Sequence, residues 1–552
     1  MGYSVFPAPS AGSSNKVFKQ KVFQTSGTWT YPSASTFNGE VEVTVVGAGG
    51  SGGGYINPSS YAYSVPLLTG GGAGGQVLLR QRMSVYGLGN QTVTIGDGGT
   101  GGYSSSAWAS MPGEDSYFGN YVAANAVYCP EMTHGLTYMS NTNVGSYVDP
   151  EKALNYLASA SPNPAPTYKS TQSGITPYFG SMSLLQTSGA DNGFNYFSDW
   201  FQVKSSTSYL FGHYYNYGPS GTSQSATWNA KIDFYDKYGA YISASTLGTV
   251  YSNVTWTKLS ATITTPSNAY YAKFRWTDVA SSGDAFVCGL FAAETASGVT
   301  TVVSGNTSGY KWASTVGYSP TVLETTPLSY ALGGSPGEGL IGISAGSGGG
   351  WKLPSTSKFG IGGASRSGTS SSTAYANFAG NGAGAGGPAT LAIAYGPGST
   401  VGSLPGAESN DDSVGWTTYR AARNRYANFG GGYAGTEARA YNGGAATQFW
   451  KFNFGTNGPD LEGYSAGGMG GYQYNANSFA NISRQTFGSI IDSLSQRYSY
   501  GTYRQSGTEY LMDARPNTGN GGNGMYVSNS SSTSSFRAGN GGSGVVIVRW
   551  YE

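Results

Sequence analysis

Hydrophobic and polar residues alternate in short runs near the start of the chain. Val41, Val43 and Val45 alternate with Glu42 and Thr44, a period of two that is typical of a half-buried β-strand. Later, Val93 and Ile95 alternate with threonines in the same way. The first part of the chain is therefore expected to form strands.

Blocks of glycine follow these strand-like runs. They bracket the protein at 47–102 and 333–544 and leave a different region between them. Glycine lets backbones approach closely, and polyglycine II segments make no internal hydrogen bonds, so a buried one must bond to its neighbours. The blocks are thus packed segments of this kind or flexible loops. Their direct attachment to strands and the low charge of the chain favour packing.

The region 131–305 has far fewer glycines. We expect one short helix at 150–160, because Pro150 suits a first helical turn. Strand-like runs separated by turn residues are expected further on, at 199–217, 228–242, 255–266, 269–279 and 284–294. Their spacing indicates a β-sandwich.

The predicted fold class is all-β, with a glycine-rich β domain, including polyglycine II-like segments in the packed interpretation, interrupted by a jelly-roll-like β-sandwich. The predicted parts of the chain are an N-terminal arm at 1–16, the glycine-rich domain at 17–130, the inserted sandwich at 131–305, and the rest of the glycine-rich domain at 306–552.

Composition narrows the class of protein. Of 552 residues, 88 are glycine and only 10% are charged, while 14% are aromatic, so the chain is unlike disordered proteins. A net charge of +1 and the lack of a basic run argue against nucleic-acid binding. No apolar run approaches the length of a membrane span, and the N-terminus has no apolar signal core. An assembled particle that faces the extracellular medium suits this composition.

The chain has two cysteines, Cys129 and Cys288, too few for a disulfide framework. They are either two buried free thiols made in a reducing cytoplasm or one bridge, since they lie near the two ends of the insert.

Two motifs fail the checks that their chemistry requires. Gly47, Gly49 and Gly52 reproduce a dinucleotide fingerprint, but no helix follows and no acidic residue stands at the ribose position. Strings of the G-x-S-x-G type surround Ser344 and Ser465, whereas the base of such a site should follow the serine. The two histidines, His134 and His213, both precede both serines.

Histidine, cysteine and acidic residues give only weak signals for a metal site or a catalytic site. The two histidines and two cysteines have no ligand spacing, and no calcium loop occurs, so neither a metal nor another cofactor is expected. Carboxylates in the insert are candidates for a glycosidase pair but are more typical of solvated strand ends: Asp191, Asp199, Asp233, Asp236, Asp278 and Asp284.

Aromatic clusters in the insert are the strongest functional signal, because flat rings offer rigid contact to the C–H faces of sugars. In 211–217, alternate residues share a strand face, so one face must pack and at most one is free. Each ring is thus either a glycan contact or part of the sandwich core. The candidate glycan-binding residues are Tyr214, Tyr215, Tyr217, Trp228, Tyr238, Tyr241 and Trp276. Loop aromatics of the glycine-rich domain, such as Tyr55 and Trp108, form either an alternative receptor site or a subunit interface.

The residues 22–54 resemble the opening of glycine-rich domains in phage tail-fibre and other virion surface proteins. The match is a Gly-Thr-aromatic-Thr-x-Pro strand, a valine-rich strand and a Gly-x-Gly-Gly block, and 91–102 and 539–552 are similar to later parts of the pattern. The resemblance covers about 17–128 and 308–552. It implies a virion protein, often trimeric and often at the host-binding end. More distantly, the chain is similar to phage adhesins built on bundled polyglycine II helices.

The insert resembles jelly-roll carbohydrate-binding modules, which implies a glycan-binding sandwich. The match runs from Phe201 to Tyr214, through Asp236–Gly239 and Thr255–Thr257, to a strand that ends at Pro266 and a closing strand at 284–294. In that closing strand Val287 and Cys288 stand where the family often has an acidic residue, so no calcium site is carried over. Residues 140–190 match the family poorly.

The leading hypothesis is therefore a non-enzymatic virion protein, a tail-fibre or spike-type adhesin that binds host-surface polysaccharide. It would be made in the host cytoplasm, act at the virion surface, contact other virion proteins through its N-terminal region and form a homotrimer, without nucleic acid or membrane insertion. The alternatives are a structural particle protein, such as a head fibre, collar or tail component, whose insert docks proteins, and a polysaccharide depolymerase.

Overall fold

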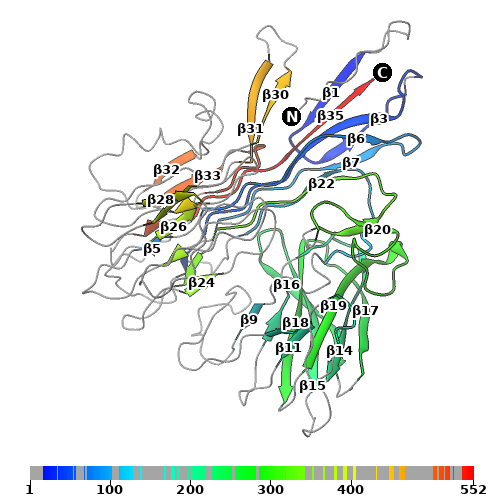
Figure 1. The fold of residues 1–552 in the computed structure, drawn as a ribbon, viewed down its shortest axis with the longest axis vertical. Helices are drawn as coiled ribbons and strands as arrows, with labels where there is room; N and C mark the ends of the chain where they lie inside the picture. Colours follow the sequence, from blue (N-terminus) through cyan, green and yellow to red (C-terminus); the bar gives the residue numbers. More distant parts are fainter. Residues whose placement is uncertain are drawn as a thin grey trace.

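A computed structural model shows the fold of the chain (Figure 1). It describes residues 17–33, 35–53, 55–56, 67–68, 71–101, 111–127, 137–139, 167–169, 176–180, 183–186, 195–198, 201–217, 227–250, 255–280, 285–316, 319–337, 339–341, 351–353, 365–366, 378–381, 390–393, 402–405, 430–431, 447–452, 459–465, 502–506, 509–514, 516–522, 526–527 and 538–552. This part is all-β with a single 3₁₀ turn, η1 (Thr295–Ser297), which confirms the predicted fold class. The predicted helix at 150–160 lies outside the described residues.

The glycine-rich domain contains two four-stranded sheets. The first has the order β1-β35-β3-β6 and the second the order β2-β7-β8-β22. Their strands are β1 (Phe18–Phe23), β2 (Gly27–Trp29), β3 (Glu40–Val46), β6 (Val77–Ser84), β7 (Gln91–Thr94), β8 (Ser116–Phe118), β22 (Ser329–Ala331) and β35 (Val545–Tyr551). The two sheets enclose a core around Trp29, which has no exposed surface.

Six of these strands continue directly into glycine segments, which run side by side away from the sheets (Figure 1). The extensions are 47–52 after β3, 71–76 before β6, 96–101 after β7, 111–115 before β8, 332–337 after β22 and 538–544 before β35. A seventh segment, 518–522, has no strand of its own. We call these seven segments the glycine bundle.

The central segment of the bundle is 47–52. Its six N–H groups donate to carbonyls of three neighbours, and each neighbour receives from residues three apart: Gly47 and Gly50 bond to 71–76, Ala48 and Ser51 to 111–115, Gly49 and Gly52 to 538–544. A repeat of three is that of the polyglycine II helix. Carbonyls of this segment in turn accept from 96–101, 332–337 and 518–522. The central segment is thus hydrogen-bonded to six surrounding ones, which confirms packing rather than flexible loops.

Glycine is required here by close approach and not by backbone angle. A Cβ added at Gly49 would lie 1.8 Å from the carbonyl oxygen of Asn520, and one at Gly541 would lie 1.8 Å from that of Gly49. Since real Cβ contacts are far longer, any side chain at these positions would push whole backbone segments apart.

The inserted sandwich is built of two antiparallel sheets, of order β10-β11-β19-β14-β17 and β16-β15-β18-β12-β9, with β13 beside β18. Its strands are β9 (Thr137–Met139), β10 (Thr167–Lys169), β11 (Ser183–Gln186), β12 (Asn195–Phe197), β13 (Phe201–Gln202), β14 (Ser208–Tyr217), β15 (Thr227–Tyr235), β16 (Tyr241–Val250), β17 (Thr257–Thr264), β18 (Tyr271–Ala280) and β19 (Ala285–Glu294). The predicted strands are present, and the run 228–242 turns at Asp236–Gly239 into the hairpin β15–β16.

Aromatic rings fill the space between the two sheets. Phe211 lies 6.0 Å from Phe234 and 6.3 Å from Phe274, centroid to centroid, and Phe274 stacks on Trp276. All four side chains are at least 99% buried, and each contributes about 1.5–3 kcal/mol of apolar transfer free energy. These rings come from three strands of both sheets, so they hold the sandwich together.

The remaining strands are short and lie beside the glycine bundle or at the junction with the sandwich. They are β4 (Tyr55–Ile56), β5 (Leu67–Leu68), β20 (Tyr310–Trp312), β21 (Thr321–Leu323), β23 (Gly339–Ile341), β24 (Trp351–Leu353), β25 (Ser365–Arg366), β26 (Phe378–Asn381), β27 (Thr390–Ile393), β28 (Gly402–Pro405), β29 (Gly430–Gly431), β30 (Thr447–Phe452), β31 (Pro459–Tyr464), β32 (Thr502–Ser506), β33 (Glu509–Asp513) and β34 (Tyr526–Val527). Among the described residues, no helix is long and apolar enough to cross a membrane.

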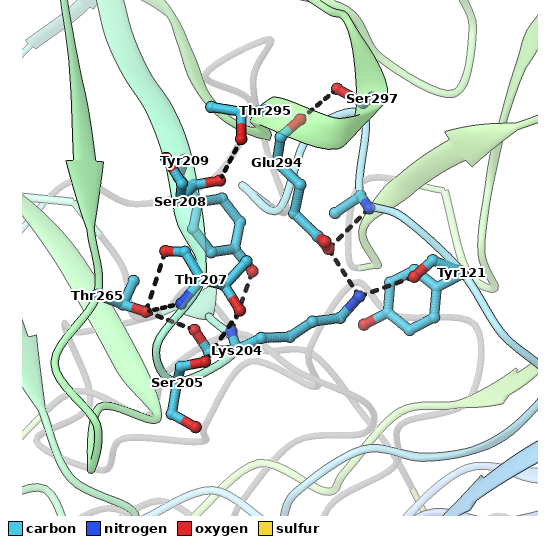
Figure 2. A network of polar contacts seen from close by, with 11 residues as sticks. Tyr121, Lys204, Ser205, Thr207, Ser208, Tyr209, Thr265, Glu294, Thr295 and Ser297 are labelled. Atoms are coloured by element: carbon cyan, nitrogen blue, oxygen red, sulfur yellow. Dashed lines mark hydrogen bonds and ion pairs between the residues drawn. The ribbon is translucent and has the colours of Figure 1, made fainter.

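A polar network joins the sandwich to the glycine-rich domain (Figure 2). The Lys204 ammonium lies 2.7 Å from Glu294 Oε1, donates to the carbonyl of Tyr121 and sits 4.2 Å from the centre of the Tyr121 ring. The same Glu294 oxygen accepts from the Ala123 amide at 2.9 Å. Because Tyr121 and Ala123 lie in the segment that leads from the glycine-rich domain, this network fixes the insert at its base.

A buried amide strengthens the same junction. Asn125 has no exposed surface, and its side chain donates to the carbonyls of Leu290 and Val303 and accepts from the amides of Val127 and Ala292. Every hydrogen-bonding position of this amide is used. The connection is therefore a packed interface rather than a free linker.

Candidate glycan-binding face of the sandwich

The outer face of the six-stranded sheet carries charged side chains. On β15, Ala230, Ile232 and Phe234 point into the core, so the intervening residues point outward. Across the β15–β18 pair, Lys231 lies opposite Arg275 and Asp233 opposite Lys273. We call Lys231, Asp233, Lys273 and Arg275 the polar strip.

Asp233 is the centre of the polar strip. Its Oδ1 lies 3.0 Å from a guanidinium nitrogen of Arg275, while its Oδ2 has no hydrogen-bond partner. Burial raises the pKa of this carboxyl to about 6, against the opposing effect of Arg275, Lys273 and Lys231. A buried carboxylate with an unused oxygen is a candidate acceptor for ligand hydroxyls.

The strip has both buried and accessible members. Asp233 and Lys273 have no exposed surface, whereas the side chain of Arg275 is 15% exposed and Lys231 is half-buried. A ligand would thus meet Lys231 and Arg275 first. Guanidinium and ammonium groups donate several hydrogen bonds each, and the carboxylate accepts them. Together they match the hydroxyl-rich edge of a sugar.

Tyrosines continue the outer face toward the glycine bundle. Tyr235 and Tyr271, opposite each other on β15 and β18, are buried against Met111 of the bundle. Tyr241, on β16, is 41% exposed and meets the Tyr235 ring edge-on at 5.8 Å. The bundle therefore closes one end of the face and leaves Tyr241 at its border.

The hairpin turn beside this border is also tied to the bundle. Tyr238 is 45% exposed, and the Lys237 ammonium lies 5.0 Å from its ring centre and 2.9 Å from Asp97 Oδ2. The ion pair between Lys237 and Asp97 holds the turn against the bundle. Within the turn, the Asp236 carboxylate accepts hydrogen bonds from the amides of Tyr238 and Ala240. Two of the predicted glycan contacts, Tyr238 and Tyr241, thus lie exposed at one place.

Two other predicted contacts are core residues. Tyr215 is 4% exposed and Trp276 is 1% exposed. Trp276 Nε1 donates to His213 Nε2 at 3.4 Å between the sheets. Both rings belong to the face of each strand that packs inward, so we withdraw Tyr215 and Trp276 as glycan contacts.

Tyr214 points away from the core, as its alternation with Tyr215 implies. It lies on the outer face of the five-stranded sheet, on the opposite side of the sandwich from the polar strip, and only 6% of it is exposed because Tyr178 stacks on it. The side chains of the remaining candidates, Tyr217 and Trp228, and of the loop residues Tyr55 and Trp108 lie outside the described residues.

The polar strip was missed by sequence reasoning. The alternation of Lys231, Asp233 and Tyr235 with apolar residues is visible in the chain, and it identifies an outward row of polar groups. Asp233 was considered only as one of several scattered acids. The positions of Lys273 and Arg275 beside Asp233 follow from the register of β18 against β15, which the sequence does not contain.

The two enzyme-like motifs have structural roles in the described region. All six N–H groups of 47–52 are used inside the bundle, so none is left to bind a phosphate. Ser465 is buried, adopts a left-handed backbone (φ 64°) and donates its hydroxyl to the carbonyl of Gly75. Ser344 and His134 lie outside the described residues.

Metal ligands do not gather in the described part of the chain, where no group of three or more histidine, cysteine or acidic side chains is found. Cys288 is a buried free thiol whose pKa burial raises to about 11. Cys129 lies outside the described residues.

One family model matches part of the chain. Residues 22–231 match the family described as a glycine-rich domain, which agrees with the glycine-rich part of the expected resemblance. No curated protein matches.

Solved structures give distant similarities. The enzymatically active domain of tailspike protein 4 from bacteriophage CBA120 is 12% identical, with 31% of this chain and 21% of that one covered and a TM-score of 0.22. This chain therefore spans about a fifth of that domain. The C-terminal family 22 carbohydrate-binding module of Clostridium thermocellum Xyn10B is 17% identical, with 33% and 98% covered and a TM-score of 0.21. The family 22 xylan-binding module of Paenibacillus barcinonensis Xyn10C is 11% identical, with 23% and 78% covered and a TM-score of 0.19.

Proposed function

We propose that this protein is a virion-surface adhesin of a phage, which binds host-surface glycans through the inserted sandwich and uses the glycine-rich domain as a rigid scaffold. The resemblance of the two regions to virion glycine-rich domains and to carbohydrate-binding modules supports this proposal. Attachment to other virion proteins through the N-terminal region and a homotrimeric state are parts of the same proposal.

The polar strip is the observation that carries the proposal. Asp233 is fully buried in this strip and keeps a carboxylate oxygen without a hydrogen-bond partner, although leaving a buried polar atom unpaired costs free energy. A face that recognises hydroxyl groups gains from donors and acceptors held in place.

The kind of exposed side chain supports a sugar ligand. Among the described residues of the sandwich, 137–294, the exposed large apolar side chains are three tyrosines, Tyr178, Tyr238 and Tyr241. Tyrosine combines a flat ring for stacking with a hydroxyl for hydrogen bonding.

Binding without cleavage is the proposed activity. A glycosidase needs two carboxyl groups about 5–9.5 Å apart on either side of the bond. The neighbours of Asp233 in the strip are three cations, and the Asp236 carboxylate is engaged in its own turn. The polar strip therefore offers no second carboxylate beside Asp233.

A polysaccharide depolymerase is the second candidate, and one observation favours it. The pKa of Asp233, raised to about 6, is close to what a general acid needs near neutral pH. Release of reducing ends from a bound polysaccharide would identify this activity.

The proposal is tested by presenting the purified full chain to a panel of bacterial capsular and lipopolysaccharide glycans and measuring both bound protein and released reducing ends. We expect binding to at least one glycan without release of ends. Binding with release would favour the depolymerase. Absence of binding across glycans of the bacterium that the particle infects would favour a purely structural role.

A further inference from the structure

The sandwich presents a second aromatic surface on the sheet opposite to the polar strip. Tyr178 is 51% exposed and stacks on Tyr214 with ring centroids 3.9 Å apart and planes 19° apart. One face of the Tyr178 ring is thus covered by Tyr214 and the other is available. Tyr214 belongs to β14, which lies between β19 and the edge strand β17 of the five-stranded sheet.

Several contacts hold the Tyr178 ring in place. The Tyr214 hydroxyl lies 2.7 Å from the Thr301 hydroxyl, which fixes the lower ring. Trp256 Nε1 donates to the carbonyl of Thr176 at 2.8 Å, and the half-buried Phe179 packs against the sandwich core. The segment 176–180 is therefore fastened on both sides of Tyr178, so little entropy would be lost when a ligand stacks on the ring.

A row of polar side chains borders the stack. On the edge strand β17, residues that point outward alternate with Leu259, Ala261 and Ile263, which pack on the core. The row consists of Lys258, Ser260, Thr262 and Thr264, of which Lys258 lies directly opposite Tyr214. From Lys258 to Thr264 the strand takes six steps of about 3.3 Å, or about 20 Å in all. The row thus offers hydroxyl and ammonium groups along an extended path.

We infer that Tyr178, supported by Tyr214 and bordered by Lys258 and the outer row of β17, is a second glycan-contact surface. It rests on the proposed function and deepens it. A pyranose ring would place its C–H face on Tyr178, and the hydroxyls of the same chain of sugars would bond to the polar row. A flat ring with a polar border along a strand fits an extended polysaccharide, which presents C–H faces and hydroxyl groups in alternation.

Two contact surfaces on opposite sheets change how the sandwich meets its ligand. One polysaccharide strand cannot cover both sheets without wrapping around the sandwich, so the two surfaces engage different strands of a dense glycan layer. When two weak contact surfaces are linked and both can bind at once, the apparent affinity of the whole is higher than that of either surface alone. The sandwich would then bind layered polysaccharide far more tightly than a short oligosaccharide.

The test compares full-length variants on a glycan that the wild type binds. Tyr178→Ala removes the open ring. Lys231→Ala/Tyr241→Ala, the strip variant, removes one of the two accessible cations of the strip and the tyrosine at its border. Tyr86→Ala is the matched control, since Tyr86 is 75% exposed in the glycine-rich domain. We expect Tyr178→Ala to weaken binding about 3- to 10-fold and Tyr178→Phe to keep wild-type affinity. Tyr86→Ala should change nothing. Combining Tyr178→Ala with the strip variant should multiply the two losses.

The outcomes separate the inference from the function on which it rests. Wild-type affinity in Tyr178→Ala, with binding lost in the strip variant, would overturn the second surface and leave the adhesin intact. Absence of glycan binding by the wild type would overturn both. If Tyr178→Ala melts at a lower temperature than the wild type, Lys258→Ala decides instead, because it leaves the ring stack in place. If Lys258→Ala then bound the glycan as tightly as the wild type, the inference would be overturned.

Discussion

The glycine bundle and the sandwich bury their interiors in opposite ways. In the bundle, backbone N–H and C=O groups of 47–52 bond to six neighbouring segments, which come so close that Gly49 and Gly541 have no room for a Cβ. In the sandwich, phenylalanine and tryptophan rings from both sheets interlock. The first solution depends on hydrogen bonds and on the absence of Cβ atoms, and the second depends on apolar area. One chain of low charge thus contains a core that cannot accept an added methyl group beside a core that can adjust to a changed one.

Adding a methyl group to the centre of the bundle should have the largest effect. Because the Cβ of Gly49→Ala would lie 1.8 Å from the Asn520 carbonyl, we expect the free energy of unfolding to fall by more than about 4 kcal/mol. Urea unfolding followed by tryptophan fluorescence measures it. Gly27→Ala is the control, since no atom lies within 4 Å of its added Cβ. Equal losses in the two variants would contradict the packed bundle.

The junction between the two regions should come next. Lys204→Met removes the cation from Glu294, which is 6% exposed, and leaves that carboxylate with the Ala123 amide. We expect a loss of about 2 kcal/mol, seen as earlier unfolding of the sandwich and easier proteolysis at the junction. Lys237→Met at the exposed pair with Asp97 should cost less than about 1 kcal/mol. A larger loss in Lys237→Met than in Lys204→Met would show that the base of the insert lies elsewhere.

The sandwich core should also respond to pH. Burial lowers the pKa of His213 from 6.5 to about 3, so the folded state keeps this imidazole neutral. Below pH 6.5 the imidazole binds a proton in the unfolded state but not in the folded state. The free energy of unfolding therefore falls by about 1.4 kcal/mol for each pH unit between 6.5 and about 3. Asp233, whose pKa is raised to about 6, opposes this trend below pH 6.

The comparison of wild type with His213→Asn isolates the histidine. The variant is expected to be less stable at neutral pH, because it loses the contact with Trp276, but its stability should fall less steeply between pH 6.5 and about 5. Unfolding midpoints measured across this range give both slopes. Parallel slopes would mean that His213 is protonated inside the folded protein.

A change of shape in the sandwich core should have the smallest effect. Phe234→Leu keeps an apolar side chain beside Phe211 in the sandwich core. Since aromatic and aliphatic residues in such a core can repack, we expect a loss of about 1.5 kcal/mol or less in urea unfolding. A loss as large as that of Gly49→Ala would remove the contrast between the two cores.

Much of the fold could be predicted from local patterns. Alternation at Val41–Val45 and the apolar runs of the insert identified strands, since a strand face is encoded by neighbouring residues. Close packing of glycine blocks followed from their attachment to these strands. Which segment bonds to which could not be predicted, because every glycine segment presents the same backbone groups. The hexagonal arrangement depends on where the strands lead.

The candidate site was harder to predict. In 211–217 the alternation showed that one face packs. Which face it is was decided by strands distant in the sequence, whose Phe234 and Phe274 rings pack on Phe211, so that Tyr215 on the same face joins the core. Tyr178 lies in a stretch with no strand pattern, so its place over Tyr214 was invisible. The polar strip likewise required the register of β15 and β18, which no single run of residues contains.

Affinity of the full chain for a bound polysaccharide, measured by titration, tests most directly whether the sandwich carries the receptor site. The decisive pair is wild type and Lys231→Ala/Tyr241→Ala, with Tyr86→Ala as control and equal melting temperatures as a check on folding. We predict at least a tenfold loss in the strip variant, which corresponds to one charge-assisted hydrogen bond, and wild-type affinity in Tyr86→Ala. Unchanged affinity in the strip variant would contradict a receptor site on this face of the sandwich.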